Sequence, residues 1–372
     1  MSDKQPNIDP WGSELVREKD YQRIIEEFGI ELIEDLDIPA SFFEDNLFFR
    51  RKLIIGHRGF ETILKAIKLQ KPWAIMSGIK PSGKFHLGTL MTAKEMVELQ
   101  NQGGFVYYSI ADIESYVDHG MTYETALEIA QDNIADIIAL GLDVNRAYIW
   151  LQSKEKLVKE MVFEAGRYVT LAMMKAIYGE RRFGLYNCAL VQVGDILLPQ
   201  LKDEVMPTVV PVGLDQDPHL RLVRDLSKYF KKDGVDLIKP ASTYHKLLPS
   251  LTDITKKMSK SISGSSFYFD QPEEEISKII LNTYTGGRRN KKEQQELGGE
   301  PDKCMIYQIL KIYFEPDDAK LGEVFQKCIN GELMCGDHKK ECAEKVLNFV
   351  KNHIKKKERA IDIARKLLNY DL

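Results

Sequence analysis

The stretch Pro81-Ser82-Gly83-Lys84-Phe85-His86-Leu87-Gly88-Thr89 determines how the rest of the chain is interpreted. A β-like run over Trp73–Ser77 precedes it, and a helix-like run over Leu87–Gln102 follows it. A strand, a glycine-containing turn and a helix N-terminus together form a place where free backbone N–H groups face a phosphate. Many junctions carry Gly and Ser only to turn the chain, so this stretch alone leaves both interpretations open.

The composition narrows the class of protein. The chain has 372 residues, 44% hydrophobic and 29% charged, which suits about two or three domains with a substantial core. Five cysteines, an odd number, argue against a secreted disulfide framework. No apolar run approaches membrane-spanning length, and the first residues lack the apolar core of a signal peptide. We therefore expect a cytoplasmic protein without a membrane segment, and the net charge of −4 neither demands nor excludes nucleic acid.

From about residue 71 the pattern alternates between strands and helices. The expected strands are Trp73–Ser77, Phe105–Ala111, Ala147–Leu151 and Thr208–Val212, and the main helices between them are Leu87–Gln102 and Thr122–Leu140. The strands are nearly continuous apolar runs, which is typical of strands buried on both faces. Short strands separated by long helices favour right-handed crossovers. The sequence predicts an α/β fold with a Rossmann-like parallel sheet.

Three domains are expected along the chain. They are a mainly helical N-terminal extension (1–70), a Rossmann-like domain (71–262) with a helical insertion (about 153–206), and a C-terminal helical domain (263–372). In an open parallel sheet the ligand lies outside the carboxyl ends of the strands, at the switch point. That rule places residues 78–88 and 213–218 on the same rim.

A second motif, Lys257-Met258-Ser259-Lys260-Ser261, lies in a lysine-rich loop beyond the last expected strand. In this order, the two motifs resemble the "HIGH" and "KMSKS" signatures of class I aminoacyl-tRNA synthetases. Amino-acid activation is an in-line attack of a carboxylate on the α-phosphate of ATP, and it needs positioning and charge stabilisation rather than a covalent nucleophile. His86 can donate to a phosphate oxygen, Gly88 leaves room for adenine, and Lys257 and Lys260 can approach the pyrophosphate.

The resemblance extends from about residue 50 to about residue 360 and is to tryptophanyl-tRNA synthetases of the archaeal and eukaryotic type. Its segments are His57–Phe60, Ala111–Tyr116, Val191–Leu197, Gly213–His219, Arg221–Asp225, Gly286–Arg288 and Leu297–Gly299. The resemblance implies a tryptophan–tRNA ligase that forms tryptophanyl-adenylate from tryptophan and Mg²⁺-ATP and then acylates tRNA(Trp). It also implies a homodimer joined through its catalytic domains, with no protein-bound metal.

The resemblance implies roles for particular residues. The implied catalytic residues are His86, Lys257 and Lys260. The implied ATP-binding residues are Arg58, Ser82, Gly83, His86, Gly88, Thr89, Gly213, Asp215, Lys257, Met258, Ser259 and Lys260. The implied tryptophan-binding residues are Met76, Tyr107, Tyr108, Glu114, Gln192, Asp195 and Gln216. The residues implied to read the anticodon are Arg288 and Arg289.

The sequence departs from the family pattern at three positions. Thr89 replaces the final histidine of the first signature, so the site relies more on its lysines. The resemblance implies that the N-terminal extension (1–70) forms an ATP-site lid around His57 and Arg58 and that the C-terminal domain (263–372) binds the anticodon. Gly59 replaces an acid that often follows His-Arg in that lid. Met76 replaces an aromatic hydroxyl, so the indole N–H must be recognised elsewhere, with Tyr107, Tyr108 and Asp195 as the candidates.

Other interpretations stay open at this point. The rival functions are a tyrosine–tRNA ligase of the same subclass, a non-catalytic RNA-binding paralogue and a nucleotidyltransferase without tRNA. Gln192 can also be a buried amide, and Asp112 and Asp195 can cap helices instead of touching a ligand. The cluster of Cys328, Cys335, His338 and Cys342 lacks paired Cys-x-x-Cys spacing, which favours core cysteines over a zinc site.

Overall fold

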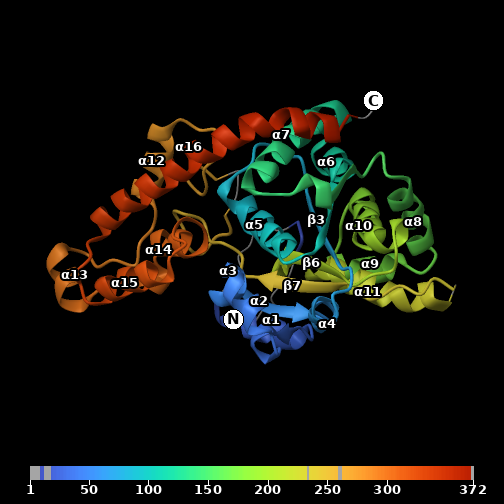
Figure 1. Ribbon diagram of the computed structural model, residues 1–372, viewed down its shortest axis with the longest axis horizontal. Helices are drawn as coiled ribbons and strands as arrows, with labels where there is room; N and C mark the ends of the chain where they lie inside the picture. The colour runs from blue at the N-terminus through green and yellow to red at the C-terminus, as the bar shows by residue number, and fades with distance from the viewer. Residues whose placement is uncertain (1–8, 12–17, 233, 259–261, 370–372) are drawn as a thin grey trace.

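The computed structural model of the chain describes residues 9–11, 18–232, 234–258 and 262–369. An α/β body contains the sheet, and a helical arm formed by the C-terminal part of the chain extends away from it (Figure 1). In the described part of the chain, no helix combines the length and the apolar character that crossing a bilayer requires.

A seven-stranded sheet forms the centre of the body, in the order β1-β2-β7-β6-β3-β4-β5. The strands are β1 (Glu31–Leu32), β2 (Ile54–Arg58), β3 (Ala74–Ile79), β4 (Phe105–Ile110), β5 (Ala147–Leu151), β6 (Thr208–Gly213) and β7 (Ala241–His245). Strands β3 to β7 are parallel, whereas β2 runs antiparallel to β7 and β1 antiparallel to β2. The order β7-β6-β3-β4-β5 is that of a Rossmann-like sheet, which confirms the predicted fold class.

The sheet is mixed rather than wholly parallel, because three strands were absent from the prediction. The predicted mainly helical N-terminal extension supplies β1 and β2. Strand β2 contains Gly56 and an irregular register, so its sequence resembles a turn. Strand β7, Ala241-Ser242-Thr243-Tyr244-His245, is fully buried yet carries three polar side chains, so it lacks the apolar run used to find the others.

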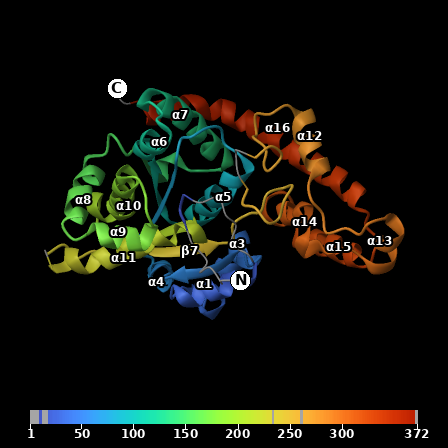
Figure 2. The ribbon, with the colours of Figure 1, turned by 180° about the vertical axis from the view of Figure 1, so that it is seen from behind.

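Helices cover both faces of the sheet (Figures 1 and 2). The helices of the body are α1 (Glu18–Glu27), α2 (Ala40–Asp45), α3 (Leu47–Arg50), α4 (Glu61–Lys68), α5 (Leu87–Asn101), α6 (Asp112–His119), α7 (Tyr123–Leu140), α8 (Lys156–Gly166), α9 (Leu171–Tyr178), α10 (Phe183–Lys202) and α11 (Asp217–Lys232). One buried cluster joins Ile75 and Tyr108 to α5 and α7, and a second joins Met76 and Tyr107 to α8, α10 and α11. Neighbouring strand residues therefore face opposite layers.

The C-terminal arm consists of α12 (Glu273–Asn282), α13 (Lys291–Leu297), α14 (Met305–Ile309), α15 (Asp318–Ile329) and α16 (Cys335–Leu367). Helix α16 has 33 residues and runs from the far end of the arm back to α7 (Figure 1). There, His353 and Lys357 each contact the buried Asp136 at 2.8 Å. Cys328 and Cys342 are buried, as expected for core cysteines.

Candidate active site

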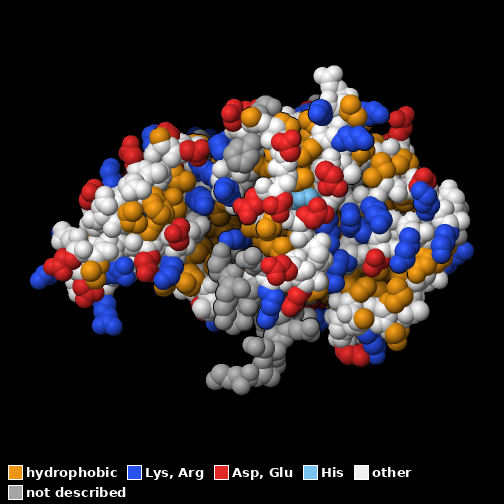
Figure 3. Space-filling model, turned by 90° about the horizontal axis from the view of Figure 1, so that it is seen from below, with side chains coloured by type: hydrophobic (Ala, Val, Ile, Leu, Met, Phe, Trp, Pro, Cys, Tyr) orange, Lys and Arg blue, Asp and Glu red, His pale blue; other side chains and the backbone are white. Residues whose placement is uncertain are grey.

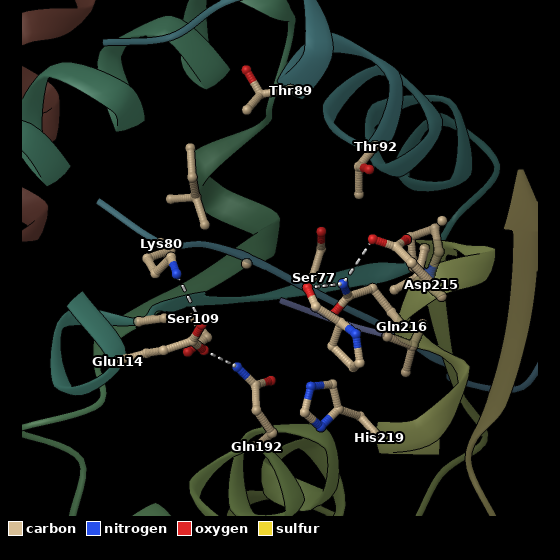
Figure 4. A pocket seen from close by; sticks show the side chains of 18 of the residues that line it. Ser77, Lys80, Thr89, Thr92, Ser109, Glu114, Gln192, Asp215, Gln216 and His219 are labelled. Carbon is tan, nitrogen blue, oxygen red and sulfur yellow. Dashed lines mark hydrogen bonds and ion pairs between the residues drawn. The ribbon is translucent and has the colours of Figure 1, made fainter. Parts of the chain in front are cut away.

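A cavity of about 540 Å³ lies at the carboxyl ends of β3, β4 and β6, on the rim that the strand pattern predicted. Residues from α5, α6, α10 and α11 complete its walls (Figure 4). The sequence-predicted residues that line it are Met76, Gly88, Thr89, Tyr108, Glu114, Gln192, Gly213, Asp215, Gln216 and Lys257. Segments on both sides of the insertion therefore meet at one site.

Glu114 is the centre of a polar network at one end of the cavity. Its Oε1 lies 3.2 Å from the ammonium nitrogen of Lys80, and its Oε2 accepts a hydrogen bond of 3.4 Å from the amide of Gln192. Lys80 also pairs with Asp118 at 2.8 Å. Figure 4 shows Glu114 between Lys80 and Gln192, with all three side chains directed at one another. A carboxylate and an amide held this way can bind an ammonium group.

The segment Asp9–Trp11 reaches the same network from the N-terminal part of the chain. The indole N–H of Trp11 donates to Oε1 of Glu114 at 3.2 Å, and the amide of Gln216 donates to the carbonyl of Pro10 at 3.3 Å. The Trp11 ring lies 5.4 Å from the ring of Tyr178 and 5.5 Å from that of His219. No motif in the sequence indicated this contact.

His219 forms an aromatic wall beside this network. Its Nδ1 lies 3.0 Å from the hydroxyl of Tyr178, and burial lowers the pKa of the imidazole to about 4. The ring is therefore neutral at pH 7. A neutral, buried ring beside Glu114 makes this end of the cavity suitable for an aromatic ligand.

The ends of β3 and β4 form the inner wall, with Met76, Ser77, Tyr108 and Ser109 lining the cavity. Burial raises the pKa of the Tyr108 phenol, so it stays protonated. The hydroxyl of Ser109 is buried and lies near the carboxylate of Asp195, behind the cavity wall. A buried hydroxyl beside a cavity is a candidate contact for a polar atom of a ligand.

The structure does not bring Tyr107 and Asp195 to the cavity. The hydroxyl of Tyr107 donates to Asp203, just beyond the last turn of α10. The buried Asp195 accepts hydrogen bonds from the indole of Trp150 at 3.0 Å and the amide of Gln152 at 2.6 Å. Burial raises its pKa to about 7, and these donors partly oppose that rise. Both residues hold the layer behind the cavity wall.

The first signature folds as a helix cap. Nδ1 of His86 accepts from the backbone N–H of Gly88 at 2.9 Å, and the Thr89 hydroxyl donates to the His86 carbonyl at 2.7 Å. A Cβ atom at Gly88 would lie 2.7 Å from the His86 ring, so glycine makes room for the imidazole. Gly88 and Thr89 line the cavity, whereas Ser82, Gly83 and His86 lie outside its lining.

The second signature approaches the same rim from the loop after β7. The ammonium group of Lys257 pairs with the Asp215 carboxylate at 2.6 Å, and both residues line the cavity. Met258 is buried in the core and does not line it. Ser259 and Lys260 lie outside the described residues.

Arg58, predicted as part of an ATP lid, occupies a buried ion pair instead. Its Nε donates to the buried Asp217 at 2.8 Å, and its Nη2 donates to the Phe28 carbonyl at 2.6 Å. A buried carboxylate needs a cation nearby, and Asp217 is fully buried. Arg58 therefore ties β2 to α11 and does not reach the cavity lining.

Arg288 and Arg289 lie on the arm just before α13 and are both exposed. The guanidinium of Arg288 donates to the carbonyl of Gly298 at 2.7 Å and lies 3.6 Å from Glu300. These contacts connect the Gly286–Arg288 turn to the Leu297–Gly299 turn. The two glycine-containing segments that carry part of the family resemblance are thus in contact.

The site also contains residues that sequence reasoning missed. They are Trp11, Ser77, Lys80, Ser109, Tyr178 and His219. Ser77 and Ser109 sit at strand ends, where the fold rule already places ligand contacts. His219 belongs to the quoted Gly213–His219 segment, whereas Trp11 carried no signal.

Known proteins are similar to this chain in sequence and in fold. Residues 68–351 match the family described as "tRNA synthetases class I (W and Y)". The tryptophan–tRNA ligase of Methanocaldococcus jannaschii is 39% identical, with 98% of this chain and 99% of that protein covered. The crystal structure of tryptophanyl-tRNA synthetase from Aeropyrum pernix superposes with a TM-score of 0.87 at 36% identity, covering 96% of this chain and 98% of that one. A structure from Encephalitozoon cuniculi bound to tryptophan gives 0.81 at 26% identity, covering 94% and 97%.

Proposed function

The chain belongs to the class I tRNA synthetases for tryptophan and tyrosine, and on this basis we propose how its cavity carries out the reaction. It is a tryptophan–tRNA ligase, in agreement with the curated relatives that match nearly its whole length. Such an enzyme joins the carboxylate of tryptophan to the α-phosphate of ATP, releases pyrophosphate and transfers the tryptophanyl group to the 3′ end of tRNA(Trp). The observation that carries the assignment of the site is Glu114, held between Lys80 and Gln192 on the same rim as Lys257.

The Glu114 end of the cavity receives the amino acid. The carboxylate of Glu114 and the amide oxygen of Gln192 accept from the ammonium group of tryptophan, and Gln216 donates to its carboxylate. Lys80 lies beside Glu114 and holds its carboxylate in place. These contacts fix the carboxylate in line with the ATP phosphates, which is the main requirement of the reaction.

Ser109 is proposed to recognise the indole N–H. Of the three candidates from the sequence, Tyr107 and Asp195 lie outside the cavity lining, whereas Tyr108 lines it beside Ser109. The buried Ser109 hydroxyl offers an acceptor at the same strand end. A tyrosine side chain has no donor at the position of the indole nitrogen, so this hydrogen bond favours tryptophan.

The ATP end contains the two signatures. His86 and Thr89 present the N-terminus of α5 to phosphate oxygens, and Gly213 and Asp215 contact the ribose. Lys257 and Lys260 approach the pyrophosphate and stabilise the charge that develops on it. ATP enters as its Mg²⁺ complex, and the metal neutralises part of the phosphate charge.

The partners are proposed from the surface. Arg288 and Arg289 contact the anticodon, because an arginine can both stack on an unpaired base and donate hydrogen bonds. A homodimer would cover the apolar surface of the insertion, where Phe163 and Phe183 are 78% and 68% exposed. Figure 3 shows hydrophobic side chains reaching the surface among Lys and Arg on that end of the molecule. The cytoplasmic location stays a prediction from the composition.

ATP–pyrophosphate exchange with purified protein tests the function. We expect exchange with tryptophan and at most a trace with tyrosine. Ser109→Ala should reduce the ratio of kcat/KM for tryptophan over tyrosine by about tenfold, since one hydrogen bond is lost. Exchange with tyrosine alone would identify a tyrosine–tRNA ligase. Absence of exchange with either amino acid, despite ATP binding, would identify a non-catalytic paralogue.

A further inference from the structure

Glu95 and His245 form a buried carboxylate–imidazole pair at the ATP end of the cavity. Neither signature contains them, and no step of the proposed reaction uses them. We propose that His245 binds a ribose hydroxyl of ATP and that Glu95 is a positioning residue that orients its imidazole. The proposal rests on the proposed function, which assigns Gly213 and Asp215 to the ribose.

The position of His245 brings it next to the proposed ribose contacts. His245 is the last residue of β7 and lines the cavity, although it is only 4% exposed. In the parallel ladder it lies opposite Gly213, the last residue of β6. Asp215 follows two residues later and also lines the cavity. The imidazole therefore lies beside the strand end to which the ribose is assigned, on the side of the sheet where parallel strands bind ligands.

Glu95 holds the imidazole from behind the cavity wall. It belongs to α5 and is fully buried. Its Oε1 accepts a hydrogen bond of 2.6 Å from the hydroxyl of Thr243, and its Oε2 lies 2.9 Å from Nδ1 of His245. Thr243 and His245 are two residues apart on β7, so both side chains point to the same face of the sheet, where α5 carries Glu95. Both oxygens of the buried carboxylate thus have a partner, as a buried charge requires.

The pairing determines which nitrogen of the ring serves a ligand. An ionised carboxylate only accepts hydrogen bonds, so Nδ1 of His245 carries a hydrogen and donates to Glu95. Nε2 is then the nitrogen left for a ligand in the cavity. A neutral ring presents a lone pair there and a protonated ring presents an N–H. A hydroxyl can donate to the first and accept from the second, whereas a phosphate oxygen can only accept.

The surroundings of His245 favour the sugar over the phosphates. Leu247 lies two residues further along the chain and also lines the cavity. A Cβ atom at Gly213 would lie 2.6 Å from the Leu247 side chain and 2.6 Å from Oδ1 of Asp215. One apolar group and one acceptor therefore enclose the end of β6 closely. A ribose offers an apolar ring face and hydroxyl groups to such a wall, whereas a phosphate beside Leu247 would lose solvation.

The contact should contribute to the preference of the protein for ribonucleotides. A site that hydrogen-bonds a substrate hydroxyl discriminates against the analogue that lacks it, because its own polar group is left without that partner. The protein should therefore bind ATP more tightly than 2′-deoxy-ATP or 3′-deoxy-ATP. A definite part of one of these two preferences should depend on His245.

Equilibrium binding of ATP, 2′-deoxy-ATP and 3′-deoxy-ATP to the full chain tests the proposal. His245→Asn keeps an amide near the position of Nδ1, where it can donate to Glu95, but has no atom at the position of Nε2. It should weaken ATP binding about three- to tenfold and reduce the discrimination against one deoxy analogue by the same factor, since that analogue already lacks the hydrogen bond. Equal weakening of all three nucleotides, or no weakening, would overturn the ribose contact.

The matched control is His353→Asn. It makes the same substitution at a buried histidine whose carboxylate partner is Asp136, at 2.8 Å and outside the cavity lining. Its thermal stability should fall, but its discrimination between the three nucleotides should stay that of the unmodified chain. A loss of discrimination in this control equal to that in His245→Asn would reduce the effect to a general loss of packing and overturn the contact.

Glu95→Gln tests the positioning role. The glutamine amide can donate as well as accept, so it no longer fixes the hydrogen on Nδ1 of His245. Part of the discrimination lost in His245→Asn should be lost here too, and an unchanged discrimination would overturn the role of Glu95. In the unmodified chain the discrimination should be the same at about pH 6 and pH 8, because a hydroxyl suits both protonation states of the ring.

These measurements separate the contact from the proposed function. Nucleotide binding is measured without tryptophan and without pyrophosphate exchange. Intact nucleotide discrimination in a chain that shows no exchange would overturn the proposed function and leave the His245 contact in place. ATP binding that strengthens at low pH in the unmodified chain but not in His245→Asn would identify a phosphate contact and overturn the assignment to the ribose.

Discussion

The two ends of the cavity hold their polar groups in different ways. At the amino-acid end, Glu114, Lys80 and Gln192 come from three segments around the sheet and converge on one point. At the ATP end, His86 and Lys257 are bonded to Gly88 and Asp215, which belong to the same site. The groups proposed for the amino acid therefore hold one another in place, and Glu114 and Gln216 also contact Trp11 and Pro10. For the groups proposed for ATP, we expect Lys257 to leave Asp215 when phosphates arrive.

Substitution of Lys257, at the proposed ATP end, should have the largest effect on the activation rate. Lys257→Ala should lower the activation rate by about 10²- to 10³-fold with a much smaller effect on tryptophan binding, because the lysine acts on charge that develops in the transition state. Lys260→Ala carries the same expectation. Pre-steady-state adenylate formation measures it, with the exposed neighbour Lys256→Ala as the control. Equal losses in rate and tryptophan affinity would contradict a transition-state role.

Substitution of Glu114 tests the end of the cavity that is proposed to bind the amino acid. Glu114→Gln keeps the shape but removes the charge that faces an ammonium group, so the KM for tryptophan should rise about 10- to 100-fold, from a hydrogen bond to a charged group worth about 1.5–3 kcal/mol. The KM for ATP should change little. Glu124→Gln, on the exposed first turn of α7, is the control. A larger change in the KM for ATP than in the KM for tryptophan would contradict the assignment of Glu114 to the amino acid.

The buried state of His219 can be read from the pH dependence of stability. Its folded pKa is about 4, below the usual value of 6.5, so the unfolded chain takes up the proton first as the pH falls. The free energy of unfolding should therefore decrease between pH 6.5 and 5 by about 2 kcal/mol from this group. Urea titrations of His219→Gln should show a shallower decrease. His119→Gln, at a partly exposed position, is the control. If stability depended on pH identically in the two variants, a buried, neutral His219 would be refuted.

Substitution of Thr89 should have the smallest effect on activity. It shows whether the Thr89 hydroxyl only caps α5 or also contacts ATP. Thr89→Ala should cost about 1 kcal/mol of unfolding free energy, because the half of the capping box that Thr89 supplies to the His86 backbone is lost. Thr122→Ala removes the N-cap hydroxyl of α7, a helix-capping threonine outside the cavity lining, and is the control. A few-fold rise in the KM for ATP in Thr89→Ala alone would show that its hydroxyl also serves the phosphates. Equal KM values would limit Thr89 to capping.

The sequence predicts the rim of the site well but its details unevenly. Apolar runs located the inner strands, since buried parallel strands leave a continuous signal. Strand β7 escaped detection because buried polar side chains such as Thr243 and His245 are satisfied by Glu95, a partner that no local pattern shows. Whether Tyr107 or Tyr108 faces the ligand depended on a one-residue register.

Long-range pairing explains the remaining differences. Arg58 looked available for ATP because its partner, Asp217, lies 159 residues away in sequence. Trp11 had no periodic pattern and no motif around it, so only its seat against Glu114 reveals it. The grouping of Glu114, Gln192 and Gln216 came from family resemblance, and the structure supplies Lys80 as the cation that organises it.

Helix α16 gives the molecule a mechanical property. At 1.5 Å per residue its 33 residues span roughly 50 Å without a break. Its C-terminal half is fastened to Asp136 of α7, and one turn earlier on α7 the Asn133 amide donates to the carbonyl of Gly83. Helix α7 therefore contacts both the turn of the first signature and the long helix of the arm. A displacement of the arm would be transmitted through α16 and α7 to the loop beside His86.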